Sequence, residues 1–116
     1  MNDTDLFQPV TMGGDLLLAN RIVMAPLTRS RAGKGDTPGP MNAEYYAQRA
    51  TAGLIISEGT PIDPLGVGYA NVPGLWSQQQ VEAWKPVVKA IHDHGGHIFA
   101  QLWHVCLLYT SPSPRD

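Results

Sequence analysis

Three short apolar segments, separated by two segments of helical periodicity, constrain the fold of this chain more than any other feature. They span residues 21–25, 54–57 and 97–102. Each is too short for a helix, and their isoleucine, valine and phenylalanine residues favour buried strands. Pro26 ends the first segment. The sequence therefore predicts three buried strands.

Two helices are expected between these strands. Asn42 is the predicted N-cap of the first helix and Gly53 its stop signal. The residues between them at helical spacing are Tyr45, Tyr46, Arg49 and Ala50. The segment Ser77-Gln78-Gln79-Gln80 fits a capping box at the start of the second helix, and Gly95-Gly96 ends it. The predicted apolar face of the second helix consists of Val81, Trp84, Val88 and Ile91.

The order strand, helix, strand, helix, strand predicts an α/β fold in which the three strands are parallel neighbours. Ahead of it, residues 6–14 with the turn signal Gly13-Gly14-Asp15 predict a hairpin. Residues 28–40 and 60–75, rich in glycine and proline, are expected to be long loops.

The turn after the first strand distinguishes between two α/β architectures. An open dinucleotide-binding sheet would place Gly-x-Gly-x-x-Gly there, whereas this chain has Ala25-Pro26-Leu27-Thr28-Arg29. A (β/α)8 barrel is therefore favoured. Because such a barrel takes about 250 residues, the 116 residues are expected to be its truncated N-terminal part.

Composition excludes several classes of partner. The chain carries 8 Lys+Arg against 10 Asp+Glu, and its net charge of −2 includes no run of like charges. Neither nucleic acid nor an anionic membrane is therefore an expected partner. No apolar segment approaches the roughly 20 residues of a membrane helix. The acidic start of the chain, residues 1–5, is unlike a targeting peptide, so the cytoplasm is the expected compartment. The oligomeric state stays open.

Four motifs then follow one another along the chain. They are Met24-Ala25-Pro26-Leu27-Thr28-Arg29, Glu44-Tyr45-Tyr46 with Arg49-Ala50, Gly53-Leu54-Ile55-Ile56-Ser57-Glu58-Gly59-Thr60, and Gln101-Leu102-Trp103-His104. With them, residues 6–105 resemble the N-terminal part of the old yellow enzyme family, FMN-dependent ene-reductases built on a (β/α)8 barrel. The resemblance implies FMN as cofactor, NAD(P)H as reductant, and an activated alkene such as an enone, maleimide or nitro compound as substrate.

The resemblance also implies a site at the carboxyl ends of the strands, where ligands of such folds bind and where residues 26–28, 58–60 and 101–104 should converge. The implied cofactor contacts are Pro26, Thr28, Gly59 and Gln101, and the implied aromatic wall of the substrate pocket is Tyr69 and Trp103. The Thr28 hydroxyl would bond to the flavin C4 carbonyl and the Gln101 amide to the pyrimidine edge. Pro26 and Gly59 would contribute backbone contacts near the ring.

No catalytic residue is expected within these 116 residues. In the family, the histidine or asparagine pair that holds the substrate and the tyrosine that donates a proton come from later strands. This part alone is therefore expected to be inactive.

The implied residues have structural alternatives. Thr28 alone reads as a turn hydroxyl or helix cap, Gln101 as a satisfied polar residue, and Trp103 as core or rim packing. Glu58 could be a general base, but an arginine such as Arg29 or Arg49 could equally hold its carboxylate.

A metal site is not expected, although His92, His94 and His97 fall within six residues and His104 follows. On a helix, His92 and His94 at i and i+2 do not face each other. His97 and His104 lie at opposite ends of a strand, roughly 20 Å apart at about 3.3 Å per residue.

Two other functions remain open. A phosphate-binding barrel lyase without redox chemistry would need a Schiff-base lysine or metal-binding carboxylates at strand ends, whereas the lysines Lys34, Lys85 and Lys89 lie in a loop and on a helix. A short non-enzymatic interaction module is the other. Residues 1–105 are taken as the barrel part. Residues 106–116, which include the single Cys106, are expected to be a disordered or artefactual tail outside the family pattern.

Overall fold

The computed structural model describes residues 3–105, and within them the chain forms five strands, two α-helices and two short 3-10 turns. The strands are β1 (Val10–Met12), β2 (Leu16–Leu18), β3 (Val23–Met24), β4 (Leu54–Pro61) and β5 (Ile98–Trp103). The helices are α1 (Pro40–Ala47) and α2 (Gln78–His92), and the 3-10 turns are η1 (Asp3–Phe7) and η2 (Pro64–Gly66). The predicted tail, residues 106–116, lies outside the described residues.

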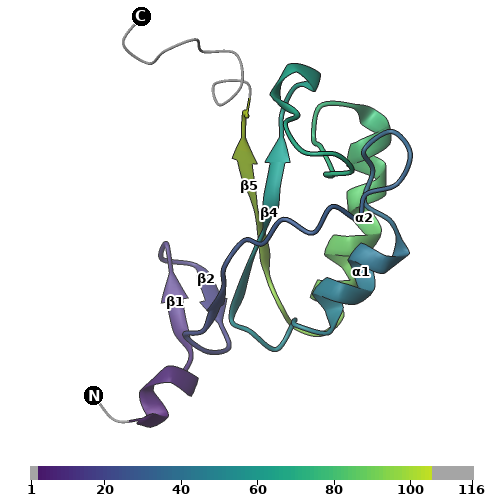
Figure 1. Ribbon diagram of the computed structural model, residues 1–116. Coiled ribbons are helices and arrows are strands. Elements are labelled where there is room, and N and C mark those ends of the chain that lie inside the picture. Colours follow the sequence, from purple (N-terminus) through teal and green to yellow (C-terminus); the bar gives the residue numbers. More distant parts are fainter. Residues whose placement is uncertain (1–2, 106–116) are drawn as a thin grey trace, which may run out of the picture.

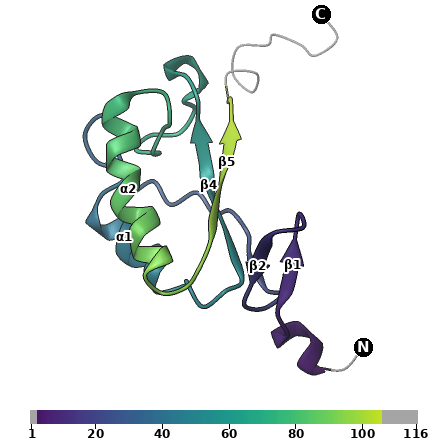
Figure 2. The same cartoon turned by 180° about the vertical axis from the view of Figure 1, so that it is seen from behind.

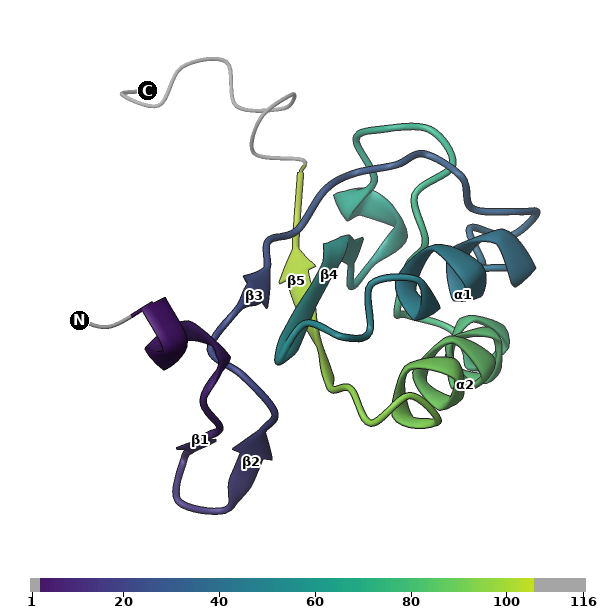
Figure 3. The same ribbon diagram turned by 90° about the horizontal axis from the view of Figure 1, so that it is seen from below.

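The strands β3, β4 and β5 form one parallel sheet in that order. Val23 pairs with Leu54, and Ile55 pairs with Ile98. Both α-helices lie on the same side of this sheet (Figures 1 and 3). The three predicted strands, their parallel pairing and the two intervening helices are thus confirmed.

Strand β4 is longer than the predicted residues 54–57 and contains a bulge. Its pairing steps from Ile56 opposite Phe99 to Gly59 opposite Gln101. Two residues of β4, Ser57 and Glu58, therefore lie opposite one residue of β5, which is the definition of a β-bulge. The strand continues through Thr60 and Pro61, which lie within the expected loop at residues 60–75.

The core lies between the helices and the sheet. Its buried residues are Tyr46, Ala50, Ile55, Trp84, Val87 and Ile91. On α2 the predicted apolar face is correct for Trp84 and Ile91 but wrong for Val81, which is 39% exposed, while Val87 is fully buried. Val81 and Val88 instead line a groove along β5, because α2 also turns one flank toward that strand.

The first helix begins earlier than predicted. Gly39 is its N-cap and Pro40 its first residue, where the missing proline N–H is not needed for helix hydrogen bonding. Asn42 is the third helical residue, and its side-chain oxygen accepts the Gly39 backbone N–H at 2.9 Å. Asn42 thus contributes to the cap from inside the helix. The regular helix also ends at Ala47, before the predicted stop at Gly53.

The predicted hairpin is present as β1 and β2, which pair antiparallel, but its second strand lies beyond the predicted residues 6–14. Gly13 and Gly14 in the turn have φ angles of 65° and 91°, a region that favours glycine. The hairpin lies near the amino ends of β4 and β5 (Figures 1 and 2). There, His97 contacts the Leu17 carbonyl oxygen at 3.2 Å through its ring Nε2. The opposite, carboxyl end of the sheet is left for a site.

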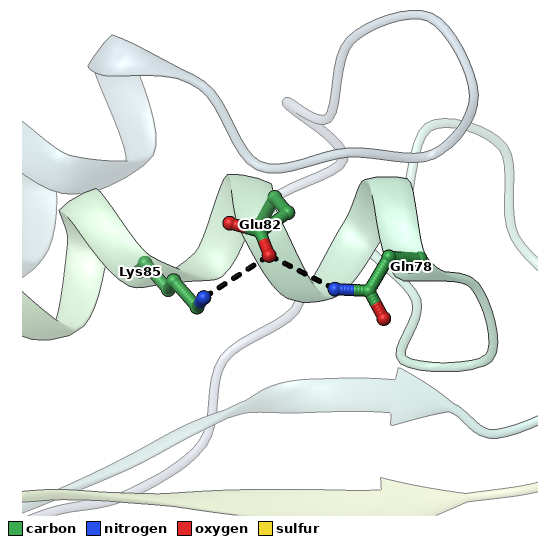
Figure 4. A network of polar contacts seen from close by, with 3 residues as sticks. All are labelled: Gln78, Glu82 and Lys85. Atoms are coloured by element: carbon green, nitrogen blue, oxygen red, sulfur yellow. Dashed lines mark hydrogen bonds and ion pairs between the residues drawn. The ribbon is translucent and has the colours of Figure 1, made fainter.

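The outer face of α2 carries a network of polar side chains (Figure 4). Glu82 accepts a hydrogen bond from Gln78 at 2.9 Å and pairs with Lys85 at 3.0 Å. These hydrogen bonds hold the pKa of the exposed Glu82 carboxyl below its ordinary value. Such exposed pairs contribute little to stability, so this face is a solvated surface of the fold.

Candidate functional site

The three predicted strand ends meet at the carboxyl edge of the sheet. Gly59 of β4 pairs directly with Gln101 of β5. The segment after β3 is tied to β4 because the backbone N–H of Arg29 donates to the Glu58 carboxylate at 3.3 Å. The predicted convergence is therefore confirmed, and it brings the neighbourhoods of Thr28, Gly59 and Gln101 to one place.

The side chains of Thr28 and Gln101 are both exposed and make no hydrogen bond to another residue in the stretch 3–105. Ile98 and Ala100 face α2, so strand alternation places Gln101 on the face of the sheet away from the helices. Pro26 is half-buried just ahead of Thr28. A hydroxyl and a carboxamide are thus available to a ligand at this edge.

Gly59 is buried, and the indole of Trp103 occupies the space in front of it. A Cβ at residue 59 would lie 2.5 Å from the Trp103 ring. The ring of Trp103 also stacks on that of Tyr69, with centroids 5.9 Å apart and an interplanar angle of 24°. The structure therefore brings the two predicted pocket aromatics together, and it gives Gly59 a packing reason for lacking a side chain.

Glu58 is the charged group most enclosed at this edge, with 1% of its surface exposed. Burial raises the pKa of its carboxyl above the ordinary value, and the Arg29 backbone N–H opposes that rise. Of the two arginines expected to hold this carboxylate, Arg29 does so through its backbone. The guanidinium groups of Arg29 and Arg49 instead lie 4.1 and 3.9 Å from the centre of the Tyr45 ring.

Two hydroxyl groups of β4 complete the site, and sequence reasoning missed both. The Ser57 hydroxyl accepts the Gln101 backbone N–H at 3.1 Å. The Thr60 hydroxyl donates to the Glu58 carbonyl oxygen at 2.7 Å. The signal available in the sequence was the polar segment at residues 57–60, which follows the apolar start of a buried strand.

These groups fit the edge of a flavin. Its carbonyl and imide groups require both donors and acceptors, and a threonine hydroxyl with a glutamine carboxamide offers both. The apolar groove of about 510 Å³ between α2 and β5 contains neither residue. The groove lies on the helix side of the sheet, and of the residues placed in the candidate site only Ser57 lines it.

Among residues 3–105, no group of three or more potential metal-ligating side chains lies together. Nor is any helix in that stretch long and apolar enough to cross a membrane.

Comparison with known proteins gives one consistent family. The model of the NADH:flavin oxidoreductase / NADH oxidase family matches residues 5–110. The chain is 54% identical over 101 residues to 12-oxophytodienoate reductase 7 of Oryza sativa subsp. japonica, covering 86% of this chain and 25% of that protein.

Solved structures agree. The old yellow enzyme homologue from Zymomonas mobilis superposes with a TM-score of 0.82 at 57% identity, covering 86% of this chain and 28% of that one. Morphinone reductase in complex with tetrahydroNAD gives a TM-score of 0.81 at 53% identity, covering 86% and 27%. The chain thus spans about a quarter of the length of these relatives. The resemblance to old yellow enzymes is confirmed, and so is the barrel architecture that it implied.

Proposed function

Because the chain belongs to the NADH:flavin oxidoreductase / NADH oxidase family, we propose that these residues form one wall of an FMN site in an oxidoreductase that uses NAD(P)H to reduce activated alkenes. The observation that carries the proposal is a pair of exposed side chains at the carboxyl edge of the sheet, Thr28 and Gln101, which make no hydrogen bond to another residue within 3–105. The relatives named as reductases support the same reaction class.

Each residue has a defined task in this proposal. The Thr28 hydroxyl donates a hydrogen bond to the flavin C4 carbonyl oxygen, and the Gln101 carboxamide offers a donor and an acceptor to the pyrimidine edge. Pro26 and Gly59 line the ring with backbone, Gly59 through its peptide atoms, because the Trp103 indole fills the space of its missing side chain. Bound FMN would supply the hydride for the β-carbon of the alkene.

The stacked aromatics Tyr69 and Trp103 form the proposed wall of the substrate pocket. Their rings present a flat apolar surface suited to enones, maleimides and nitro compounds. In this proposal, the groups that hold the substrate and donate its proton come from outside these 116 residues, which are inactive alone.

The cytoplasm is the compartment proposed.

The lyase alternative finds no support from the lysines of α2. Lys85 pairs with Glu82, and Lys89 pairs with Asp93 at 2.8 Å, both on the exposed side of the helix. Neither amine lies at the carboxyl edge of the sheet, where a Schiff-base lysine would be needed.

A hybrid barrel tests the proposal. Residues 5–105 are joined to the remaining part of the Zymomonas mobilis relative, which is 57% identical over the shared region. We expect stoichiometric FMN and NAD(P)H-dependent reduction of 2-cyclohexenone. The double variant Thr28→Ala/Gln101→Ala should weaken FMN binding, whereas Gln78→Ala on the outer face of α2 should not. A folded hybrid without FMN would contradict the proposal.

A further inference from the structure

We propose that Glu58 is a positioning residue for the flavin site: its buried carboxylate holds the backbone of Arg29 and so determines where the preceding residue, Thr28, presents its hydroxyl. The inference rests on the proposed function, because it assigns Glu58 a task toward the Thr28 contact. It also makes a claim about the Arg29 backbone that stands without a flavin.

The segment that carries Thr28 has little regular structure of its own. Strand β3 is only two residues long and ends at Met24. After it, the Arg29 N–H donates to Glu58 Oε1 at 3.3 Å, and the next long-range backbone hydrogen bond runs from Ala32 to Asn71 at 2.9 Å. The Glu58 contact is therefore well placed to fix the backbone beside Thr28.

Glu58 is itself held firmly enough to act as an anchor. Its backbone N–H donates to the Tyr46 hydroxyl oxygen at 3.0 Å, and its carbonyl oxygen accepts from Ser57 at 2.9 Å and Thr60 at 2.7 Å. The residue lies in the bulge of β4, and bulges commonly re-aim side chains beside active sites. The carboxylate thus has a fixed origin.

The same bulge also contacts Gln101, the second proposed flavin contact. Ser57, the neighbour of Glu58, accepts the Gln101 backbone N–H at 3.1 Å. One extra residue in β4 therefore lets two adjacent side chains hold the backbones beside Thr28 and at Gln101. Both proposed flavin contacts are oriented from this single point.

A catalytic role does not fit the surroundings of Glu58. With 1% of its surface exposed, it has no access to a substrate. Its Oε1 is engaged by Arg29, and its Oε2 is buried without a hydrogen-bond partner among the described residues. A buried carboxyl with an unpartnered oxygen costs folding free energy. A positioning task explains why such a group stands here.

The first test uses the 116-residue chain without flavin. Amide hydrogen exchange, followed by ¹⁵N NMR, reports on the Arg29 N–H. We expect its protection to fall at least tenfold in Glu58→Ala and to persist in Glu58→Gln, whose amide oxygen can still accept. Glu82→Ala is the matched control, because it removes an exposed glutamate. Unchanged protection in Glu58→Ala would overturn the proposed contact.

The second test uses the hybrid barrel and measures the FMN dissociation constant. We expect Glu58→Ala to raise it about tenfold, which corresponds to about 1.4 kcal/mol. Glu58→Gln should restore the original value. In a double-mutant cycle, Glu58→Ala should raise the FMN dissociation constant little further in a protein that already carries Thr28→Ala, because both changes remove the same flavin contact. A purely structural role would lower the melting temperature and leave the two effects additive.

The outcomes separate the two proposals. If the unmodified hybrid binds no FMN, the proposed function fails, and the positioning of a flavin contact fails with it, while NMR still decides the Arg29 contact. If the hybrid binds FMN and Glu58→Ala binds it equally well, only the positioning role is overturned. If Glu58→Ala does not fold, Glu58→Asp takes its place. This variant keeps the carboxylate on a side chain one methylene shorter, and we expect it to raise the FMN dissociation constant as well.

Discussion

The hydroxyl oxygen of Tyr46 accepts the backbone N–H of Glu58 at 3.0 Å. This contact joins α1 to the bulge of β4, and Tyr46 is 1% exposed. Burial is the main cause that raises the pKa of the Tyr46 phenol above its ordinary value. The phenol therefore stays protonated across the physiological range, and the anchor of the bulge does not depend on its ionisation.

Replacing Tyr46 by phenylalanine is expected to destabilise the chain by about 1–3 kcal/mol, because a buried N–H loses its acceptor. Urea unfolding of the 116-residue chain measures the effect. Tyr45→Phe is the control, since it keeps the ring that the guanidinium groups of Arg29 and Arg49 contact. Equal stability of the two variants would show that the Tyr46 hydroxyl bond contributes nothing.

The raised pKa of Glu58 predicts how stability depends on pH. The folded-state pKa lies above the ordinary 4.5, so the folded state binds the proton more tightly than the unfolded state. The contribution of Glu58 to folding is then fully present below pH 4.5 and is lost as pH rises through the folded-state pKa. Glu58→Gln should remove this loss.

Unfolding free energies of the original chain and Glu58→Gln, compared from pH 4 to pH 8, provide the check. The variant should gain stability relative to the original chain as pH rises. Asp93, whose pKa is lowered by the Lys89 hydrogen bond, titrates in both proteins and cancels in the difference. A difference that is constant with pH would contradict the prediction.

Thr28→Ala in the hybrid barrel is expected to lower the flavin midpoint potential by tens of millivolts. A neutral hydrogen bond is worth roughly 0.5–1.5 kcal/mol net, and for a two-electron couple 30 mV corresponds to about 1.4 kcal/mol. Reduction by NAD(P)H should slow, and alkene reduction should hold or quicken. Anaerobic redox titration and stopped-flow kinetics measure these effects. An unchanged potential with FMN fully bound would mean that Thr28 does not touch the flavin edge.

Gly59→Ala is expected to displace the Trp103 indole, because the new Cβ would lie 2.5 Å from it. The strain should cost about 1–3 kcal/mol of unfolding free energy. Fluorine NMR with fluorotryptophan should show the Trp103 signal moving while the signals of Trp76 and Trp84 stay in place. Gly39→Ala, which meets no atom within 4 Å, is the control.

Much of this fold could be predicted because its strands are apolar enough to stand out. Ile55 and Ile98, which pair across the sheet, both lie in segments predicted as strands. The barrel followed from the turn at Pro26 and from the motif resemblance. Thr28 and Gln101 could be placed at strand ends for the same reason.

Other features depend on contacts between distant residues, which a linear pattern does not carry. The strand β4 was predicted to stop at Ser57 because polar residues and a glycine follow, yet the bulge gives those polar groups partners in other elements. Asn42 looked like an N-cap because its residue type favours that position, whereas the backbone of Gly39 takes it. The sequence suggested Arg29 as a partner of Glu58 through its charged side chain, whereas the structure uses the Arg29 backbone N–H, which every residue except proline carries.

The bulge in β4 has a consequence for insertions and deletions. Because strand side chains alternate between faces, losing one codon from a regular strand turns every later residue to the wrong side. Loss of the codon for Ser57 would leave Glu58 alone opposite Ala100, and Gly59 would still pair with Gln101. Such a deletion keeps the alignment of the sheet while removing the hydroxyl that holds the Gln101 backbone. Natural variants shortened at this point would therefore keep the barrel and lose the Ser57 contact that positions Gln101.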